Sequence, residues 1–506
     1  MLGLVTQVMI AWLFGTTAAS DAYFVALGFV TSLMNPLGAT LTYALIPMLS
    51  HYLAREGEEA TRQATAAAMG MVAVVFLAGA LASAAAAGVL VQVLAPGFDP
   101  PARKVATDLL RIMSPALFFL GIGGVVTALC HARRHFVIPT IAGWAIDTGI
   151  ILAALAFSAR LGVRSLALGL SLGSAAHAVV PLAILARRGH LGRLTPNFAH
   201  PAVRLVLRAI PSTTLAGSVL VINLMLDRAF ASALASGWIS ALEFGMRVVF
   251  LPVTLFAQPI SRAVFPLLSS LGSHETQREK FAETLSLTLR LVVWVGVPST
   301  VGLVVLRQPL VRVLFQRGSF GAASTDMTAA ALLYYSLGIA AYMLYEAVIR
   351  AHYSLGNLGR PLKAGCATVA VNVVANLILG YRFGARGIAL GTSLASAVGV
   401  GIMLEGLRER LALMRISHLL AVLLRTGAAS AAMAVVCRLL WRGLGSLPGS
   451  WGREVIALGA AVVAGGAVFA AVSSALGGTE WITVRTLVLG RRSQAGGPER
   501  GDGHRG

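Results

Sequence analysis

The sequence predicts an all-α polytopic membrane protein with about 14 membrane-crossing helices. Hydrophobic residues make up 57% of the 506 residues, and charged residues only 12%. Apolar runs of roughly 20 residues, the length that crosses the hydrocarbon core, recur from one end of the chain to the other. Lipid-exposed backbone must satisfy its own hydrogen bonds, and long apolar segments do so as helices. A soluble chain of this size would need far more polar surface.

An internal repeat predicts how these helices are grouped. Residues 139–174 align without a gap with 361–396, with 15 identities in 36 positions, and Gly162 matches Gly384. Chance similarity between Ala- and Leu-rich helices would not keep such glycines in register. Each copy holds six predicted helices, an even number, so the two copies are expected to be parallel repeats that form two lobes. Transporters built from such repeats bind substrate between the lobes.

The apolar segments divide the chain into four predicted parts. These are an N-terminal lobe at 1–190, a C-terminal lobe at 204–408, two C-terminal helices at 416–477 and a disordered tail at 490–506. The predicted helices cover 1–15, 21–53, 66–94, 105–130, 137–159, 163–185, 205–233, 238–271, 281–306, 327–351, 361–381, 387–407, 419–441 and 455–476. The first is short for a span, so either helix one is truncated or Met1 is not the true start. The amphipathic stretch 307–326 is expected to lie at the membrane interface.

The charge distribution predicts orientation and argues against nucleic-acid binding. The formal net charge is +20, but the basic residues lie in short loops and form no single patch. Cytoplasmic loops are rich in Lys and Arg. The arginine-rich loops are 54–65, 131–135, 187–204, 273–280, 350–363 and 408–415. With the basic tail, they predict a multi-pass membrane protein whose termini are both cytoplasmic.

No motif predicts an enzyme or a resident cofactor. Cys130, Cys366 and Cys437 lie far apart, without the spacing of a zinc site or a disulfide framework. Most of the ten histidines fall in the arginine-rich loops, without partners at the spacing of a catalytic triad. We therefore expect a protein that binds and moves a solute, or one that only organises the membrane.

The stretch 222–252 holds the most informative charges. Asp227, Arg228, Glu243 and Arg247 all lie within two apolar segments joined by a short Ala-Ser-Gly turn. Charges at membrane depth are costly, so they face a partner, a cavity or a solute. Internal ion pairs that fix helix packing are the alternative, and for Arg247 the partner would then be Glu243, one helical turn away. Spacing alone leaves both interpretations open.

A cation site is the second candidate. Asn372 and Asn376 are four residues apart, so they share one face of a helix. Thr392 lies early in the following helix, and Asp227 falls at a similar depth to Asn376. One carboxylate with amide, hydroxyl and carbonyl oxygens suits a hard monovalent cation such as Na⁺. A polar cluster that only joins helices is the alternative.

Four segments resemble the MurJ/MviN family, which flips a lipid-linked peptidoglycan precursor. They are SDAYFVAL at 20–27, the central stretch at 222–252, LFQRGSF at 314–320 and YSLGNLGRPLKA at 353–364. The resemblance covers predicted helices one to twelve, and more loosely the last two. It implies the fold of the multidrug/oligosaccharidyl-lipid/polysaccharide exporters, with two six-helix lobes and two added helices.

The resemblance also implies roles for particular residues. Arg247 matches an arginine that contacts the lipid pyrophosphate, and Asp21 and Glu243 are expected to contact substrate with it. A Na⁺ site is implied at Asp227, Asn372, Asn376 and Thr392, with a backbone carbonyl at Ile388, and Na⁺ would then be the coupling ion. The family's Arg-Asp pair in helix one falls on Thr6 and Gln7 here, and its arginine pair in helix two falls near Met34 and Asn35.

The expected function is therefore a flippase that moves a polyprenyl-pyrophosphate-linked saccharide across the inner membrane by alternating access. The expected partners are a lipid-linked oligosaccharide of the undecaprenyl-pyrophosphate type and the membrane lipids, with the protein acting as a monomer. Because Thr6, Gln7, Met34 and Asn35 replace charged residues, the saccharide could differ from that of lipid II. Two alternatives stay open: a cation-coupled multidrug exporter of the same fold, and a diverged scaffold that does not transport.

Overall fold

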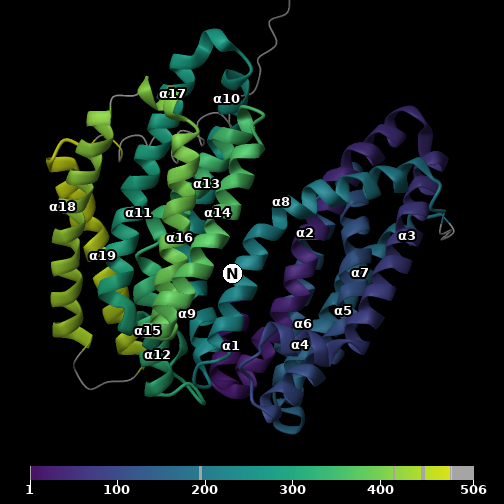
Figure 1. Cartoon of the computed structure of the whole chain (residues 1–506), viewed down its shortest axis with the longest axis horizontal. Coiled ribbons are helices and arrows are strands. Elements are labelled where there is room, and N and C mark those ends of the chain that lie inside the picture. Colours follow the sequence, from purple (N-terminus) through teal and green to yellow (C-terminus); the bar gives the residue numbers. More distant parts are fainter. Residues whose placement is uncertain (1, 193–196, 414–415, 446–450, 479, 481–506) are drawn as a thin grey trace, which may run out of the picture. The chain divides into compact units, whose positions relative to one another are not determined.

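All of the predicted membrane segments form helices, and the described residues contain no strand (Figure 1). The computed structural model describes residues 2–192, 197–413, 416–445, 451–478 and 480. Within these ranges, eleven helical segments are long and apolar enough to cross a membrane, or twelve if one bent pair is counted as a single span. The two other predicted spans are a 13-residue apolar helix, Leu2–Phe14, and the helix Pro201–Ala231. The predicted tail at 490–506 lies outside the described residues.

The helices follow one another along the chain with short connections. In the first half they are α1 (Leu2–Phe14), α2 (Ala18–Arg55), α3 (Gly57–Ala85), α4 (Ala87–Leu94), α5 (Pro100–Ala132), α6 (Val137–Leu161), α7 (Arg164–Arg187), α8 (Pro201–Ala231), α9 (Trp238–Pro252) and α10 (Gln258–Gly272). They continue as α11 (Arg278–Phe315), α12 (Ala322–Ser336), α13 (Ile339–Ser354), α14 (Gly359–Ala375), α15 (Tyr381–Phe383), α16 (Ala385–Glu405), α17 (Arg408–Ala412), α18 (Ile416–Leu440) and α19 (Trp451–Ala475). Three π-helical turns extend α9, α14 and α18, at Val253–Ala257, Asn376–Gly380 and Trp441–Gly445. The bent pair is α12 and α13, which meet at 47°.

The sequence repeat is visible in the backbone and in its hydrogen bonds. Gly162 and Gly384 end the matching helices with nearly the same torsion angles, φ 55° and 60° with ψ −137° and −138°. Ser171 Oγ donates to the carbonyl of Ile112 at 2.6 Å, and Ser393 Oγ donates to that of Tyr334 at 2.8 Å. Donors and acceptors are both offset by 222 residues (393 − 171 and 334 − 112). This agreement supports two copies of one parallel unit.

The chain forms two compact units of contacting residues. Unit 1 contains residues 1–248, 314–335 and 362–398, and unit 2 contains 249–313, 336–361 and 399–506. Unit 1 therefore includes the first predicted lobe together with segments of the second. These groupings do not test the lobe boundaries at 1–190, 204–408 and 416–477, which stay predictions.

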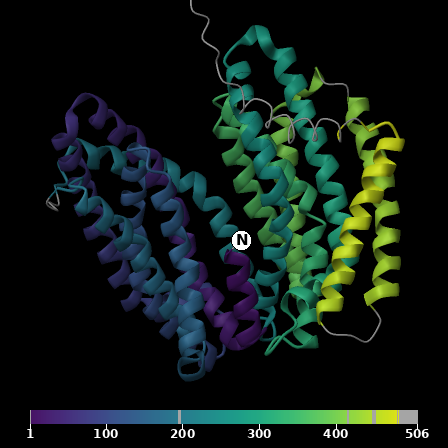
Figure 2. The ribbon, with the colours of Figure 1, turned by 180° about the vertical axis from the view of Figure 1, so that it is seen from behind.

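Unit 1 packs through glycines and aromatic rings. In both ribbon views α6 lies beside α7 (Figures 1 and 2), and a Cβ at Gly149, Gly169 or Gly173 would come within 3 Å of the facing backbone, so only glycine permits this approach. A second contact is a cluster of aromatic side chains. Its members are the buried Phe24, Phe244, Phe315 and Phe320, with ring centroids 5.3–5.7 Å apart.

The stretch 307–326 forms the end of α11, which continues to Phe315, and the start of α12. Phe315 and Phe320 are buried in the aromatic cluster of unit 1. Apolar side chains of this amphipathic stretch therefore pack against protein, and its position at the membrane interface stays a prediction.

Unit 2 holds the two C-terminal helices against α11. Trp294 packs its ring against Phe469, and its indole N–H donates to Ser473 Oγ at 3.0 Å. At the far end of the same helix, Arg312 pairs with Glu454 at 2.7 Å. An apolar contact with a satisfied indole and an ion pair therefore fix α19 against α11.

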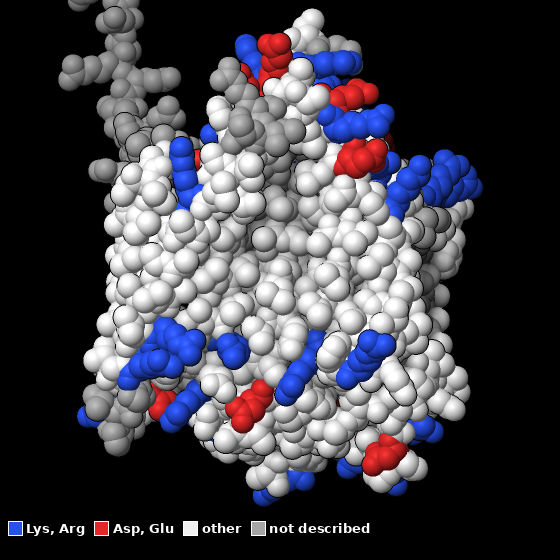
Figure 3. All heavy atoms as spheres, turned by 60° about the vertical axis from the view of Figure 1, so that its left-hand side comes forward, with Lys and Arg blue, Asp and Glu red and all other residues white. Residues whose placement is uncertain are grey.

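The surface has the charge pattern of a membrane protein. On the face drawn in Figure 3, Lys, Arg, Asp and Glu gather toward the two ends of the helices and leave a broad uncharged band between them. Large apolar side chains such as Trp144, Leu152 and Leu155 of α6 are exposed. An apolar band that would be insoluble in water is the surface that a bilayer covers.

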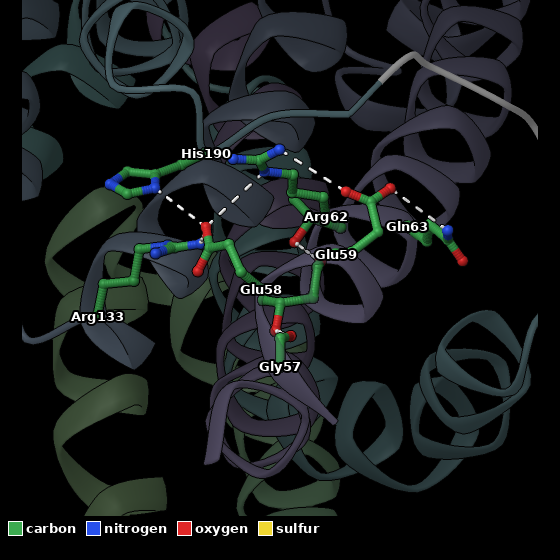
Figure 4. Close-up of polar contacts among 9 residues, drawn as sticks. Gly57, Glu58, Glu59, Arg62, Gln63, Arg133 and His190 are labelled. Atoms are coloured by element: carbon green, nitrogen blue, oxygen red, sulfur yellow. Dashed lines mark hydrogen bonds and ion pairs between the residues drawn. The ribbon is translucent and has the colours of Figure 1, made fainter. Parts of the chain in front are cut away.

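Glu58 joins three of the arginine-rich loops at one end of unit 1 (Figure 4). Its carboxylate accepts from Arg133 Nη2 at 2.5 Å, after α5, and from His190 Nδ1 at 3.2 Å, after α7. Glu58 itself lies in the first turn of α3, where a negative charge also suits the helix dipole. The Arg133 side chain is only 8% exposed, so its charge depends on this partner.

We predict that Glu58→Ala lowers the free energy of unfolding of the protein in detergent by roughly 1–2 kcal/mol, because it leaves the largely buried Arg133 charge without this partner. Glu59→Ala is the matched control. The Glu59 side chain is 72% exposed and lies 3.7 Å from Arg62, so its loss should change little. Unfolding followed by tryptophan fluorescence checks both variants, and equal melting temperatures for the two would contradict the structural role of Glu58.

Candidate functional site

Asp21 lies at the start of α2 and is saturated with hydrogen-bond donors. Its Oδ1 accepts from the Ser240 amide at 2.7 Å and from the Ser240 hydroxyl, and its Oδ2 accepts from the Gly237 amide. The Ser240 hydroxyl also lies 2.9 Å from Ser20 Oγ. Asp21 therefore caps the N-terminus of α9, where amide groups and the helix dipole favour a carboxylate. This arrangement ties α2 to the turn between α8 and α9.

The α8–α9 turn needs a glycine and a close neighbour. Gly237 has φ +94°, a left-handed conformation that favours glycine, and a Cβ there would collide with the Thr16 carbonyl. On the other side of the turn, the Gly97 amide donates to Ser232 Oγ at 3.1 Å. The Ala-Ser-Gly turn is therefore held by the connection before α2 and by the one before α5.

The charges of the central stretch form a pair that differs from the one considered at the sequence level. Glu243 pairs with Arg228, whose Nε donates to Oε1 at 2.8 Å. The guanidinium of Arg228 rests against Gly28 of α2, where a Cβ would overlap it. Arg247 is exposed, and no ion pair with it occurs among the described residues. Its guanidinium is therefore available to a ligand.

The predicted cation-site residues converge. Asp227 Oδ1 accepts from Asn376 Nδ2 at 2.7 Å, and Asp227 Oδ2 accepts from Thr392 Oγ1 at 2.8 Å. Asn372 Oδ1 lies 2.9 Å from Asn376 Nδ2. The carbonyl of Ile388 lies 3.0 Å from Thr392 Oγ1. All five residues are buried, so α8, α14 and α16 meet at one polar cluster.

One atom of this cluster is unsatisfied. Asn376 Oδ1 is buried and has no hydrogen-bond partner in the described structure. Asn376 opens the π-helical turn Asn376–Gly380, and a Cβ at Gly391 would lie 2.9 Å from its Oδ1. Buried acceptors are rarely left unpaired. Together with the carboxylate and carbonyl oxygens nearby, this orphan acceptor fits a hard cation such as Na⁺.

Many protein metal sites are instead built from several His, Cys, Asp or Glu side chains. No group of three or more such residues that could hold a metal ion occurs in the described ranges of the chain. The Na⁺ candidate does not depend on that pattern, since Asp227 supplies its only acid and neutral oxygens supply the rest.

Three of the four positions where the resemblance implies missing charges are buried. Thr6 and Gln7 of α1 are buried, as is Met34 of α2. The side chain of Asn35 is not among those described. Thr6 donates to Asp147 of α6 at 3.0 Å, a contact that the sequence analysis missed. The available signal was an acid in the middle of an otherwise apolar segment.

Comparison with known proteins identifies relatives along most of the chain. A family model described as lipid II flippase MurJ matches residues 10–466. A probable lipid II flippase MurJ of Vibrio cholerae is 30% identical over 422 residues, which cover 80% of each chain. The lipid II flippase MurJ of Burkholderia cenocepacia is 25% identical over 418 residues, or 81% of each chain.

Solved structures show the same fold. A lipid II flippase MurJ in an inward closed conformation superposes with a TM-score of 0.79 at 24% identity, covering 96% of this chain and 97% of that one. An inward-facing multidrug transporter of the MATE family gives a TM-score of 0.68 at 15% identity, over 82% and 95% of the two chains. The predicted fold class is thereby confirmed.

We predict that Asp21→Asn destabilises the protein by about 2–3 kcal/mol, because one of its acceptor oxygens becomes an NH₂ group that faces N–H donors. Asp99→Asn is the control. Asp99 caps α5 through a single bond to the Ala102 amide at 2.9 Å, and asparagine caps a helix as well as aspartate does. Thermal unfolding in detergent should separate the two. Equal losses would mean that the donors around Asp21 add nothing beyond an ordinary cap.

Proposed function

Because this chain belongs to the lipid II flippase MurJ family, we propose that it moves a lipid-linked saccharide precursor of the cell envelope across the inner membrane. The proposed substrate is lipid II or a related undecaprenyl-pyrophosphate-linked saccharide. The observation that carries this proposal is the match to the family along residues 10–466. The chain is then a transporter and not an enzyme, with its arginine-rich loops and both termini in the cytoplasm. We propose that it works as a monomer surrounded by membrane lipids.

Arg247 is proposed to hold the pyrophosphate. It is exposed, and Glu243 is already neutralised by Arg228, so the positive charge of Arg247 is not cancelled by that acid. A guanidinium binds phosphate oxygens through two parallel hydrogen bonds, which a single ammonium cannot do. Glu243 then acts through Arg228 and does not meet the phosphate directly. A carboxylate beside a pyrophosphate would repel it.

We propose that Asp21 first holds the outer side of the transporter closed. Its three donors close α2 against the α8–α9 turn, which carries none of the arginine-rich loops. Alternating access requires that this contact opens when substrate leaves toward the outer leaflet. The carboxylate is then exposed and can meet hydroxyl groups of the departing headgroup.

Na⁺ is proposed as the coupling ion. Asp227, Asn372, Asn376, Thr392 and the Ile388 carbonyl would hold it, and the ion would supply the charge that the buried carboxylate lacks. The support is the orphan Asn376 Oδ1 within a set of oxygen ligands. Loading and release of the cluster would alter the packing of α8 against α14 and α16, and so bias one conformation over the other.

We predict that this chain restores growth to a bacterial host depleted of its lipid II flippase, and that Arg247→Ala reduces labelled precursor in the outer leaflet about tenfold or more. Arg247→Lys should recover only part of the transport, because lysine lacks the planar fork. Arg382→Ala is the control, since Arg382 is an exposed arginine of α15 with no proposed role.

Other outcomes of this experiment select other functions. Absence of rescue by protein shown to be in the membrane would favour a different lipid-linked saccharide. Raised resistance of the host to organic cations would favour a multidrug exporter, the second function compatible with the fold. Rescue by all of these variants would remove Arg247 from the mechanism.

We also predict that the purified protein melts at a higher temperature in NaCl than in equimolar KCl. At a hundredfold excess of Na⁺ over its Kd, the free energy of unfolding should be higher by roughly 2–3 kcal/mol. Asp227→Ala and Thr392→Ala should abolish the difference, because each removes an oxygen ligand. Thr368→Ala should retain it, since the Thr368 hydroxyl of α14 donates within its own helix, to the Ala364 carbonyl, in the part of the chain that the structure describes. If the wild type melts at the same temperature in NaCl and in KCl, the cluster has only a structural role.

A further inference from the structure

Asp147 is an acidic residue that none of the proposed steps uses. It lies at the centre of α6, a helix apolar enough to cross the membrane, and it is half-buried. A carboxylate at this depth is expensive, and such residues mark functional sites by default. The position of Asp147 therefore requires a functional or a structural explanation.

The protein itself satisfies Asp147 poorly. One oxygen accepts from the Thr6 hydroxyl at 3.0 Å, and that hydroxyl also lies 3.2 Å from the Leu2 carbonyl of its own helix. No ion pair joins Asp147 to any described residue. Ionised carboxylates accept about four hydrogen bonds, so most of this capacity is unused. By contrast, the buried acids Asp21 and Asp227 each bind at least two donors.

Helices α1 and α2 hold two further polar atoms that lack a partner in the described structure. Gln7, one residue after Thr6 on α1, is 5% exposed and its Oε1 has no partner. The hydroxyl of the fully buried Tyr23 on α2 also lacks a partner. Neither Asp147 nor Arg247 has an ionic partner among the residues that the structure describes.

We propose that Asp147 recognises the hydrogen-bond donors of the translocated headgroup, its hydroxyl, amide or ammonium groups, while Arg247 holds the pyrophosphate. This inference rests on the proposed function and deepens it. A carboxylate attracts donors and repels phosphate, so the two charges would orient a ligand that has an anionic end and a donor-rich end. Asp147 then distinguishes a lipid-linked saccharide from the bare pyrophosphate lipid.

The opposing explanation is structural: Asp147 could serve only to bond α1 to α6 through Thr6. The two explanations differ at Thr6→Ala. That variant removes the interhelical bond and keeps the carboxylate, so a structural role predicts the same defect as in Asp147→Ala. A recognition role predicts a defect in Asp147→Ala alone.

The experiment measures the affinity of the purified full-length protein in detergent for two probes, lipid II and undecaprenyl pyrophosphate. The wild type should bind lipid II more tightly, and Asp147→Ala should lower the ratio of the two affinities on the order of tenfold, leaving the affinity for undecaprenyl pyrophosphate unchanged. Asp147→Asn, which keeps the size and one acceptor, should lower the ratio less and covers the case in which Asp147→Ala does not fold. Thr6→Ala should keep the wild-type ratio. So should Asp108→Asn, a carboxylate removed from an exposed ion pair with Arg164.

The outcomes separate this inference from the function on which it rests. A wild type that binds both probes equally, or an Asp147→Ala variant that keeps the wild-type ratio, overturns the role of Asp147 and leaves the flippase proposal standing. Loss of the ratio in Thr6→Ala as well would assign Asp147 to helix packing. A wild type that binds neither pyrophosphate lipid overturns the proposed function itself, and Arg247→Ala should weaken binding of both probes if it stands.

Discussion

A fully buried carboxylate must be met by donors, and Asp21 and Asp227 organise unit 1 through this requirement. Asp21 gathers two backbone amides and a hydroxyl from the α8–α9 turn, and Asp227 gathers an amide and a hydroxyl from α14 and α16. Burial without these donors would cost several kcal/mol for each charge. Helices that are distant in sequence are therefore joined where a buried polar group needs a hydrogen-bond partner. Apolar contacts fill the space between these points.

Irregular backbone occurs next to these polar points. The π-helical turn after α14 begins at Asn376, which contacts Asp227, and Gly391 of α16 leaves room for its side chain. The left-handed Gly237 lies beside Asp21. Such local departures from ideal helices place side chains and amides where a regular helix would not, and π-helical turns are frequent at functional sites. Irregular backbone and buried polar side chains thus occur at the same places in the chain.

The fold could be predicted from hydropathy and from the repeat, because apolar length and charge asymmetry are properties of the sequence itself. The convergence of Asp227, Asn376 and Thr392 was also predictable, since spacing placed the amides on one face and the resemblance supplied the rest. The partner of Glu243 was not predictable. Arg228 and Arg247 were both available to it, and the choice depends on how the α8–α9 turn folds back.

The contact between Thr6 and Asp147 could not be predicted from the sequence either. The two residues lie 141 positions apart, on helices whose patterns are apolar all round. Periodicity then says that each helix is buried or faces lipid, but not which neighbour each side meets. Pairing of α1 with α6 is a property of the packed bundle.

The two copies of the repeat share their architectural bonds but not their polar cluster. Ser171 and Ser393 make the same interhelical bond, whereas the residues opposite Asn372, Asn376 and Thr392 at the offset of 222 are Ile150, Ala154 and Leu170. The first copy in turn holds an acid, Asp147, that the second lacks, since Val369 stands opposite it. Each copy therefore keeps the common scaffold and carries polar side chains of its own. The two halves of the repeat are interchangeable as architecture but not as chemistry.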